Sequence, residues 1–386
     1  MRLPYNPEKR FSPGNATLPA MPIKVLVISN YRETASVRPE AELFIGLKKV
    51  GLDIEIMTYG DAWYVEKFRA AGIKVIDFHP QKKLDKAEIR RIRETLVHGG
   101  HHILHLFNSK AIINGIQAVK GLPVKVVLYR GYAGNIHWYD PTAYFKYLHP
   151  RVDKITCIAE AIEDYLKGQL FFKKEKAVTI HKGHDLSWYQ NIEPLDLSGF
   201  NIPENAFVAT CVANARPMKG IPYLIQSSYY LPPELPIYYI LVGKNLNVGK
   251  AAILVKNSPH KDKIYFTGYR NDALHIVAAS DVFVLSSIYG EATTKAVIEA
   301  MSLGKTPVIT DIPGNRGLVV NEQCGLVVPP RNPKGIADAI LKLYHHRDLC
   351  KKYGVEARKH IMEHFNIRNT VEKTRQLYEQ MLSKKI

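Results

Sequence analysis

Cysteine and long apolar runs are both scarce in this chain of 386 residues. Its four cysteines, Cys157, Cys211, Cys324 and Cys350, have neither metal-ligand nor redox spacing, which predicts reduced thiols rather than a disulfide framework. No stretch approaches the roughly 18 apolar residues that a membrane-spanning helix needs, and the first residues lack the apolar core of a signal peptide. We therefore expect a cytoplasmic protein, with peripheral contact on the inner face of the cytoplasmic membrane left open.

Two nucleotide-binding fingerprints are also missing. No Gly-x-Gly-x-x-Gly follows the first predicted strand and no Walker A loop occurs, so dinucleotide-dependent oxidoreductases and P-loop NTPases are disfavoured. Acidic residues are outnumbered, 36 Asp and Glu against 53 Lys and Arg, and the formal net charge is +17. A basic surface attracts nucleic acid, anionic lipid or an acidic substrate. Because no basic-aromatic signature of nucleic-acid binding occurs, we expect no nucleic-acid partner.

Short apolar, strand-like runs alternate with helical patterns along the whole chain. Such alternation builds a parallel sheet with helices on both faces, and this chain is too long for one ordinary core. The sequence therefore predicts an α/β protein of two doubly wound, Rossmann-like domains, residues 1–195 and 196–366. We expect a polar linker at 185–203 and a final helix, 367–386, that packs back on the first domain. The predicted strands are 23–29, 53–58, 73–78, 102–107, 124–129 and 154–158, then 207–213, 237–242, 264–267, 281–285, 306–309 and 325–328.

The most informative pattern is a pair of glutamates eight positions apart, Glu291 and Glu299. The first lies in a Gly-containing loop after the apolar run 282–285, and the second lies in a helix predicted to start near Thr293. The start of such a helix presents free backbone N–H groups to an anion, and carboxylates accept hydrogen bonds from hydroxyl groups. An anion site flanked by two carboxylates suits a nucleotide sugar. The alternative is a solvated helix face on which Lys295 and Glu299 form an i,i+4 pair.

A basic loop, 214–220, follows the first predicted strand of the second domain. Arg216 and Lys219 in this loop supply two cations, which can stabilise a diphosphate leaving group without a metal ion. Gly220 lets the backbone pass close to a ligand. A solvated basic turn is the alternative interpretation.

These motifs resemble the Glu-x7-Glu signature and the Arg…Lys-Gly element of retaining GT-B glycosyltransferases of the glycosyltransferase family 4 type. The resemblance extends from about residue 21 to the end and is more specific in the second half. It implies two Rossmann-like domains facing a cleft, retention of the anomeric configuration, no metal and no cofactor, with a nucleotide diphosphate sugar as donor. It assigns Glu291 to the sugar's hydroxyls and Glu299 to the ribose. The implied catalytic residues are Glu291, Arg216 and Lys219, and the donor-binding residues are Arg216, Lys219, Gly220, Gly268, Tyr269, Glu291, Ala292, Thr293, Thr294 and Glu299.

The chain departs from the family pattern at several positions. Gly317 stands where the family commonly has a glutamate, and residues 292–295 replace an aromatic or apolar residue followed by a small one. The family's glycine pair after the first strand is missing, and its histidine near the end of the fifth strand has no clear counterpart. The candidates for acceptor binding are Asn30, Arg32, Arg130, His137 and Asp140, and a plain loop role is the alternative for each.

We expect a retaining, metal-independent hexosyl or related transferase that moves a sugar from a nucleotide diphosphate sugar to a cell-envelope glycan or glycolipid. A nucleotide-sugar epimerase on the same fold and a non-catalytic module that binds a glycan or a protein partner are the alternatives. An epimerase would need acidic residues poised at C2 of the sugar, and the first domain has no evident cluster of this kind.

A possible membrane contact lies at Phe171 and Phe172, which precede the lysines of segment 173–176. Adjacent aromatic rings beside lysines suit a peripheral anchor on anionic lipid. The alternative is a helix C-terminus capped by lysines, with the two rings packed inward.

Overall fold

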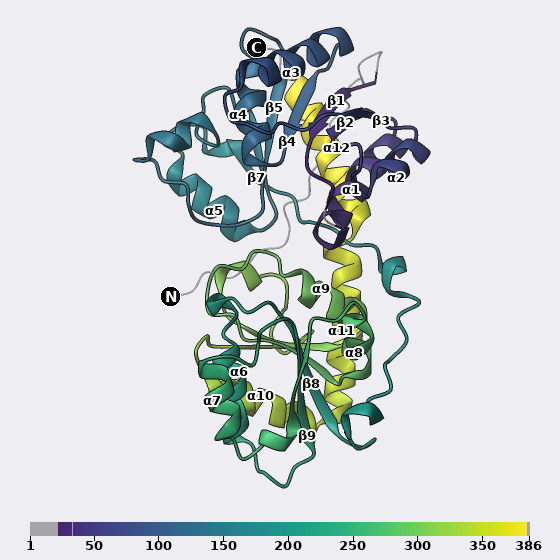
Figure 1. Cartoon of the computed structure of the whole chain (residues 1–386), viewed down its shortest axis with the longest axis vertical. Helices are drawn as coiled ribbons and strands as arrows, with labels where there is room; N and C mark the ends of the chain where they lie inside the picture. The colour runs from purple at the N-terminus through teal and green to yellow at the C-terminus, as the bar shows by residue number, and fades with distance from the viewer. Residues whose placement is uncertain (1–21, 33, 384–386) are drawn as a thin grey trace.

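The computed structural model describes residues 22–32 and 34–383, which form two α/β domains stacked along the long axis of the molecule (Figure 1). The first domain contains, in chain order and with 3-10 turns labelled η, β1 (Lys24–Ile28), α1 (Thr34–Lys49), β2 (Asp53–Thr58), α2 (Val65–Ala70), β3 (Lys74–Asp77), α3 (Lys86–Gly99), β4 (Ile103–Leu106), α4 (Ser109–Ala118), β5 (Lys125–Arg130), η1 (Pro141–Phe145), β6 (Lys154–Cys157), α5 (Glu160–Gln169), η2 (Lys174–Lys176) and β7 (Ala177–Thr179). Its parallel sheet has the order β3-β2-β1-β4-β5-β6-β7.

The second domain repeats this arrangement. It contains η3 (Leu186–Tyr189), η4 (Ser198–Phe200), β8 (Phe207–Val212), η5 (Pro217–Lys219), α6 (Ile221–Ser227), η6 (Ser228–Tyr230), β9 (Ile237–Val242), α7 (Lys250–Lys256), η7 (Lys261–Lys263), β10 (Ile264–Gly268), α8 (Ala273–Ala279), β11 (Val282–Leu285), α9 (Lys295–Ser302), β12 (Thr306–Thr310), η8 (Pro313–Asn315), β13 (Leu326–Val328), α10 (Pro333–His345) and α11 (Arg347–His364). The parallel strands have the order β10-β9-β8-β11-β12-β13. The predicted fold class of two doubly wound parallel sheets is therefore confirmed.

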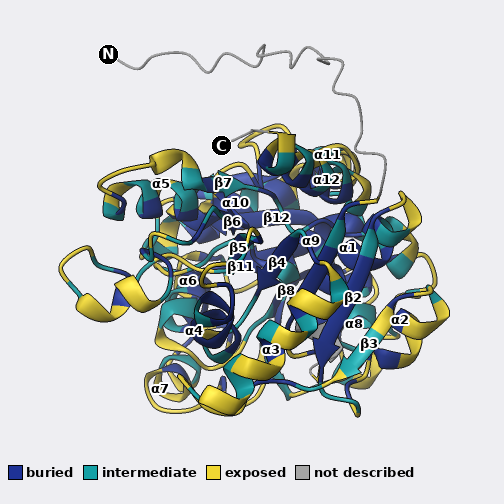
Figure 2. Ribbon diagram, turned by 90° about the horizontal axis from the view of Figure 1, so that it is seen from above, coloured by how far each residue is buried: buried dark blue, intermediate teal, exposed yellow. Residues whose placement is uncertain are grey.

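The strands are near-continuous apolar runs because helices cover both faces of each sheet. All residues of β4 and β11 are buried, as is typical of parallel sheets. Figure 2 shows the strands buried in the interior and the outer faces of helices such as α3 and α7 exposed. Local signals set the helix ends: the Asp85 carboxylate accepts from the N–H groups of Ala87 and Glu88 at the start of α3, and Gly100 ends that helix with φ 63°.

The strand order reverses beside the first strand of each domain, between β1 and β4 and between β8 and β11. In open α/β sheets, ligands bind outside the carboxyl ends of the strands at such a reversal. The loop that contains Lys219 follows β8, and the loop that contains Glu291 follows its neighbour β11. The fold therefore brings the two predicted donor motifs to one point of the sheet edge.

The C-terminal helix α12 (Ile367–Ser383) leaves the second domain and runs beside α1 of the first (Figure 1). Val371, Leu377 and Tyr378 lie in the first domain's hydrophobic core, and the Tyr378 hydroxyl is 2.7 Å from His105 Nδ1. In the part of the chain that the structure describes, no helix is both long and apolar enough to span a bilayer.

The two segments that connect the domains hydrogen-bond to each other. The backbone N–H of His184 donates to the Phe365 carbonyl at 2.7 Å, and that of Ile367 donates to the His184 carbonyl at 3.0 Å. A Cβ at Gly183 would lie 2.3 Å from the Asn366 carbonyl oxygen, so a larger residue there would separate the two segments.

One strand was missed by the sequence patterns. β7 is only three residues long, lies at the edge of its sheet and buries Ala177 alone, so it has no apolar periodicity to detect.

Candidate active site

An ion pair joins the loops that follow β8 and β11. Lys219 Nζ lies 2.6 Å from Glu291 Oε1, and their side chains are only 14% and 9% exposed. The Ser287 hydroxyl donates to the same carboxylate oxygen at 2.6 Å. Both bonds that the described residues make to this carboxylate fall on Oε1, so Oε2 is the oxygen that can accept from a ligand hydroxyl.

Close backbone contacts hold these two loops together. The Ser286 hydroxyl donates to the Lys219 carbonyl at 3.0 Å, and the Ile288 N–H donates to the Met218 carbonyl at 2.8 Å. Gly220 has φ 63°, and a Cβ there would lie 2.1 Å from the Ser286 carbonyl oxygen. Gly220 thus permits the approach of the two loops, which is a role in packing beside the ligand role implied by the sequence.

A third loop, after β12, packs against the backbone of Glu291. A Cβ at Gly314 would lie 1.9 Å from the Glu291 carbonyl oxygen, so only glycine fits under the Glu291 backbone. The Asn315 side-chain amide donates to the Thr310 carbonyl at 3.0 Å and fixes this loop. The contacts that Ser287 and Gly314 make with Glu291 were not predicted, because a serine and a glycine in loops carry no spacing signal.

Arg216, the second predicted diphosphate cation, lies at the start of η5 and is exposed. The short turn Pro217–Lys219 separates it from the buried ion pair. An exposed guanidinium on this loop is free to swing toward an anion, whereas Lys219 is already held against Glu291.

Glu299 lines a cavity of about 480 Å³ between the domains, together with Tyr269 and Lys295. Lys295 pairs with the Glu299 carboxylate across one turn of α9. Tyr269 is 75% exposed, and it follows Gly268, whose φ of 67° suits glycine and which has open space around its Cα. The structure therefore brings the predicted ribose and base residues to one hollow, and the ion pair on α9 faces this hollow rather than bulk solvent alone.

The first domain supplies the opposite wall of this cavity through residues that the sequence did not reveal. Arg38 of α1 and Tyr64 both line it, and both Arg38 Nε and the Tyr64 hydroxyl are buried without a hydrogen-bond partner among the described residues. The Arg38 guanidinium lies 4.2 Å from the ring centre of Trp188. Burial raises the pKa of Tyr64 to about 12. Arg38 Nε at the cavity wall is thus available to a polar ligand, whereas the Tyr64 hydroxyl lies beside the Glu42 carboxylate.

The side chains after Glu291 contact the first domain. The Thr293 hydroxyl donates to the Ile158 carbonyl at 2.7 Å, and Ala292 packs against the first domain's core. Thr294 is buried, with its hydroxyl 3.4 Å from Asn315 Oδ1. These three residues were expected to bind the donor, with their loop amides facing it; the side-chain contacts seen here leave those amides for a ligand.

Two predicted acceptor residues after β1, Asn30 and Arg32, contact each other and the segment that precedes α2. Arg32 makes a bidentate pair with Asp61, with both N–O distances 2.9 Å, and its guanidinium lies 3.7 Å from the ring centre of Tyr59. The Asn30 side chain accepts from the Arg32 backbone N–H at 3.0 Å. These contacts are those of the plain-loop alternative, and a role of the two residues in acceptor binding stays a prediction.

The predicted acceptor residues after β5 also have structural partners. Arg130 is buried and donates to the carbonyls of Tyr132, at 2.8 Å, and Gly134, so it holds the loop rather than opening to an acceptor. Asp140 caps η1 by accepting from the Thr142 N–H and hydroxyl, both at 2.8 Å, and the N–H bond in particular lowers its pKa. His137 stacks on Tyr139 at 5.1 Å and is only partly buried, which leaves it as the more available of the three.

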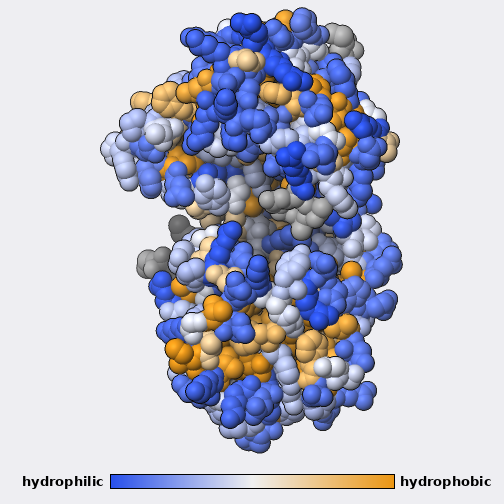
Figure 3. All heavy atoms as spheres, viewed as in Figure 1, coloured by the Kyte–Doolittle hydropathy of each residue, from blue (hydrophilic) through white to orange (hydrophobic). Residues whose placement is uncertain are grey.

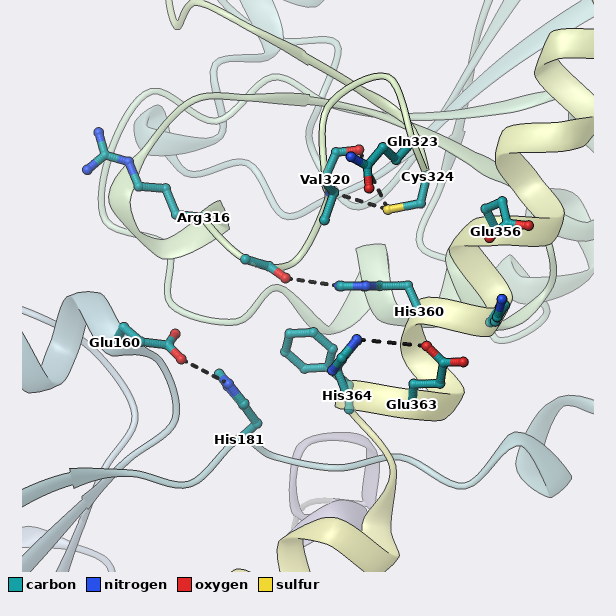
Figure 4. A pocket seen from close by; sticks show the side chains of 13 residues that line it. Glu160, His181, Arg316, Val320, Gln323, Cys324, Glu356, His360, Glu363 and His364 are labelled. Atoms are coloured by element: carbon teal, nitrogen blue, oxygen red, sulfur yellow. Dashed lines mark hydrogen bonds and ion pairs between the residues drawn. The ribbon is translucent and has the colours of Figure 1, made fainter. Parts of the chain in front are cut away.

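A larger cavity, of about 800 Å³, lies between the domains beside the connecting segments (Figure 4). His181, which lies 3.1 Å from Glu160 in the first domain, faces His360 and His364 on α11 across this space, and His360 is 3.0 Å from the Gly317 carbonyl oxygen. It contains none of the predicted donor residues. Of the predicted donor residues, Tyr269 and Glu299 line the smaller cavity. Figure 3 shows the surface drawn in between the two domains.

Among residues 22–32 and 34–383, no three His, Cys, Asp or Glu side chains are grouped as metal ligands. The positive charge around the site comes from side chains: Arg38, Lys67, Arg270 and Lys295 line the smaller cavity. Arg270 is paired with Asp272 at 2.6 Å, so part of this charge is already compensated.

Comparisons with known proteins agree with this geometry. Residues 195–360 match the family described as glycosyl transferases group 1, and residues 41–188 match glycosyltransferase family 4. An uncharacterised glycosyltransferase of Methanocaldococcus jannaschii is 26% identical over 64% of this chain and 63% of its own length. The UDP-Gal:alpha-D-GlcNAc-diphosphoundecaprenol alpha-1,3-galactosyltransferase of Escherichia coli is 26% identical over 74% of this chain and 77% of its own.

The fold has a counterpart in the solved structure of Anabaena HepE in complex with UDP. That protein is 17% identical, with a TM-score of 0.74 over 93% of this chain and 100% of its own. Both halves of the chain thus match glycosyltransferase families, and the two domains have the corresponding architecture. The chain belongs to the GT-B glycosyltransferases of the family 4 type.

Proposed function

We propose that this protein is a retaining, metal-independent transferase that takes a hexosyl or related sugar from a UDP-sugar and attaches it to a lipid-linked cell-envelope glycan. The observation that carries the proposal is the Lys219–Glu291 pair, buried at the strand ends where doubly wound sheets bind their ligands. An ammonium group beside a carboxylate can bind both the diphosphate and the sugar of a nucleotide sugar. Lys219 attracts the diphosphate, and Glu291 accepts from the sugar's hydroxyls.

The choice of UDP rests on two similarities. The HepE structure contains UDP, and the Escherichia coli relative is named for a UDP-sugar donor. In this chain the nucleoside would occupy the cavity of about 480 Å³, with Tyr269 beside the base and Glu299 accepting from the ribose hydroxyls. The diphosphate would then extend along the loop amides after Glu291 toward Lys219.

Charge stabilisation at the leaving group is the main catalytic contribution that we assign to the protein. The bond between the anomeric carbon and the diphosphate oxygen breaks, and negative charge develops on the diphosphate. Lys219 and Arg216 stabilise this charge in place of a metal ion. The acceptor oxygen bonds to the same face of the anomeric carbon, and its proton passes to the departing diphosphate. Retention follows because attack and departure use one face.

The acceptor class rests on the same Escherichia coli relative, whose named acceptor is a sugar on diphosphoundecaprenol. His137, in the loop after β5, is a predicted acceptor residue that is partly open in this structure. A lipid-linked acceptor would reach the cleft from the edge formed by this loop.

The first test is thermal unfolding with UDP, GDP, ADP and CMP and their sugars, in the presence of EDTA. A ligand that binds only the folded state, at a hundred times its dissociation constant, adds about 2.7 kcal/mol of stability. We expect UDP or a UDP-sugar to raise the melting temperature, and NMR of the glycoside product to show the donor's anomeric configuration. If no nucleotide shifts the transition, the alternative of a non-catalytic module replaces the proposal. A released sugar epimer without transfer would indicate the epimerase instead.

A further inference from the structure

Seven exposed aromatic side chains gather on one side of the first domain. They come from the loop after β5 and from the end of α5, and they are Tyr132, Trp138, Tyr139, Tyr144, Phe145, Phe171 and Phe172. We refer to them as the aromatic surface. In Figure 1, α5 and the neighbouring loops form the outer left edge of the upper domain.

The two segments contact each other through Trp138, which joins Phe171 to the loop after β5. The rings of Trp138 and Phe171 are 5.2 Å apart in an edge-on arrangement, and the Trp138 N–H donates to Gln169 Oε1 at 3.2 Å. The Tyr144 hydroxyl donates to the Trp138 carbonyl at 2.9 Å. These bonds fix the backbone while leaving the rings open to solvent.

These rings are exposed although the segments that carry them also contribute buried apolar residues to the core. Ile136, Ala143 and Leu170 in the same segments are buried, whereas Phe171 is 62% and Phe172 85% exposed. The alternative in which both phenylalanines pack inward is therefore wrong. Phe172 is followed by Lys173 in the left-handed region, φ 57°, a conformation that turns the chain directly after the aromatic pair.

Lysines border the aromatic surface. Lys173 and Lys174 are exposed directly after Phe172, and Lys146 follows Phe145. The exposed Glu175 follows Lys174, and the Asp140 carboxylate is occupied by Thr142. Tryptophan and tyrosine favour the interfacial zone of a bilayer, phenylalanine inserts more deeply, and lysines are attracted to anionic headgroups.

We propose that the aromatic surface docks this protein on an anionic lipid bilayer, with Phe171 and Phe172 inserted and the flanking lysines on the headgroups. The loop after β5 begins at the carboxyl edge of the first sheet, which borders the cleft. Docking there would place the cleft at the membrane surface, within reach of a lipid-linked acceptor; this orientation rests on the proposed function, but the docking does not.

The test is co-sedimentation of the full chain with vesicles of phosphatidylglycerol and phosphatidylcholine. We expect binding that weakens at raised salt and is lost with pure phosphatidylcholine. The double variant Phe171→Ser/Phe172→Ser should lower partitioning by about tenfold or more, while Phe171→Leu/Phe172→Leu keeps it because the inserted groups stay apolar. The matched control is Val248→Ser/Ile253→Ser, two apolar residues of the second domain that are 58% and 63% exposed.

Unchanged sedimentation of the serine variant, or equal loss in the control, would overturn the proposal. Equal binding to pure phosphatidylcholine would overturn its electrostatic part. A concentration-dependent dimer that the serine variant abolishes, without vesicle binding in the wild type, would assign the aromatic surface to a second copy of the chain instead. Nucleotide-induced thermal shifts test the catalytic site separately, so failure of one proposal is distinguishable from failure of the other.

Discussion

Lys219 and Glu291 are 72 positions apart in the chain, yet Lys219 Nζ lies 2.6 Å from Glu291 Oε1. The pair is held by the adjacency of β8 and β11 and by the absence of a side chain at Gly220. In the structure, each of the two charges therefore has a partner while it is largely shielded from water. A diphosphate sugar can take over both partners at once, the anion facing Lys219 and a hydroxyl facing Glu291.

Replacing either partner should therefore impair catalysis strongly. We expect Lys219→Ala, Glu291→Ala and Arg216→Ala each to lower kcat by about 10²-fold or more, because each removes a group that acts on charge or on the reacting sugar. The kcat of the double variant Lys219→Ala/Glu291→Ala should be only slightly lower than that of the less active single variant, since the pair acts as a unit. Steady-state kinetics with the donor identified by thermal shift would measure this.

The control is another lysine–carboxylate pair. Lys334 and Asp338 are 2.7 Å apart on α10 but exposed, so Lys334→Ala should leave kcat unchanged. Wild-type turnover in the Lys219 and Glu291 variants, or multiplication of their effects in the double variant, would contradict the site assignment.

Glu299 should act mainly on nucleotide affinity. We expect Glu299→Ala to weaken UDP binding by about tenfold to a hundredfold, because hydrogen bonds to a charged acceptor contribute about 1.5–3 kcal/mol. Lys295→Ala removes the helix partner but leaves the carboxylate, so its effect should be smaller. Calorimetric titration distinguishes the two: equal affinity of wild type and Glu299→Ala would mean that the pair only decorates the helix.

The sequence predicted the parts of this protein that depend on local pattern. Twelve of its strands correspond to continuous apolar runs, Glu291 and Lys219 stood in loops whose position after a strand was evident, and Glu299 stood in the helix that follows. The sequence patterns did not predict the order of the strands, and it is the adjacency of β8 and β11 in the structure that brings Lys219 near Glu291.

The features that the sequence did not predict depend on contacts that only the folded chain forms. Arg130 and Asp140 looked like candidates for chemistry because they are polar residues in a loop, but partners within the loop occupy them. Arg38 looked like an ordinary helix residue, and only the approach of the second domain places it at the cavity that contains Glu299. The contact of Thr293 with Ile158 likewise exists only because the domains meet.

Arg38 should contribute to donor binding from the first domain. Its Nε is buried without a hydrogen-bond partner and lines the cavity that contains Glu299, so a polar nucleotide group can accept from it. We expect Arg38→Ala to weaken UDP binding by about tenfold, in keeping with the loss of one charged hydrogen bond. Arg32→Ala is the matched control, because Arg32 is paired with Asp61 and should leave the affinity unchanged. A larger loss of UDP affinity in Arg32→Ala than in Arg38→Ala would contradict this assignment and would favour a ligand-binding role for Arg32.

Two glycines separate steric contact from backbone strain. Gly220 and Gly268 have nearly equal φ angles, 63° and 67°, but a Cβ at Gly220 would lie 2.1 Å from the Ser286 carbonyl oxygen, whereas nothing lies within 4 Å at Gly268. We expect Gly268→Ala to lower the free energy of unfolding by about 1–2 kcal/mol, from the left-handed conformation alone. Gly220→Ala should cost clearly more and also lower kcat, because the loops that carry Lys219 and Glu291 must separate. Urea denaturation of the two variants checks this, and equal losses would argue against the close approach.

Acid should destabilise the junction between α12 and the first domain through His105. Burial lowers the pKa of His105 to about 3, against about 6.5 for a free histidine. Between these values the unfolded chain binds the proton more readily, so stability is complete above about pH 7 and falls as the pH drops toward 3. From pH 7 to pH 5 the loss amounts to about 2 kcal/mol for this one group. In His105→Asn the amide can still pair with the Tyr378 hydroxyl but cannot titrate, so the free energy of unfolding should fall less steeply over that interval, whatever its value at pH 7. The exposed His98→Asn serves as control, and an identical pH slope in wild type and His105→Asn would show that His105 is not the group that acid protonates on unfolding.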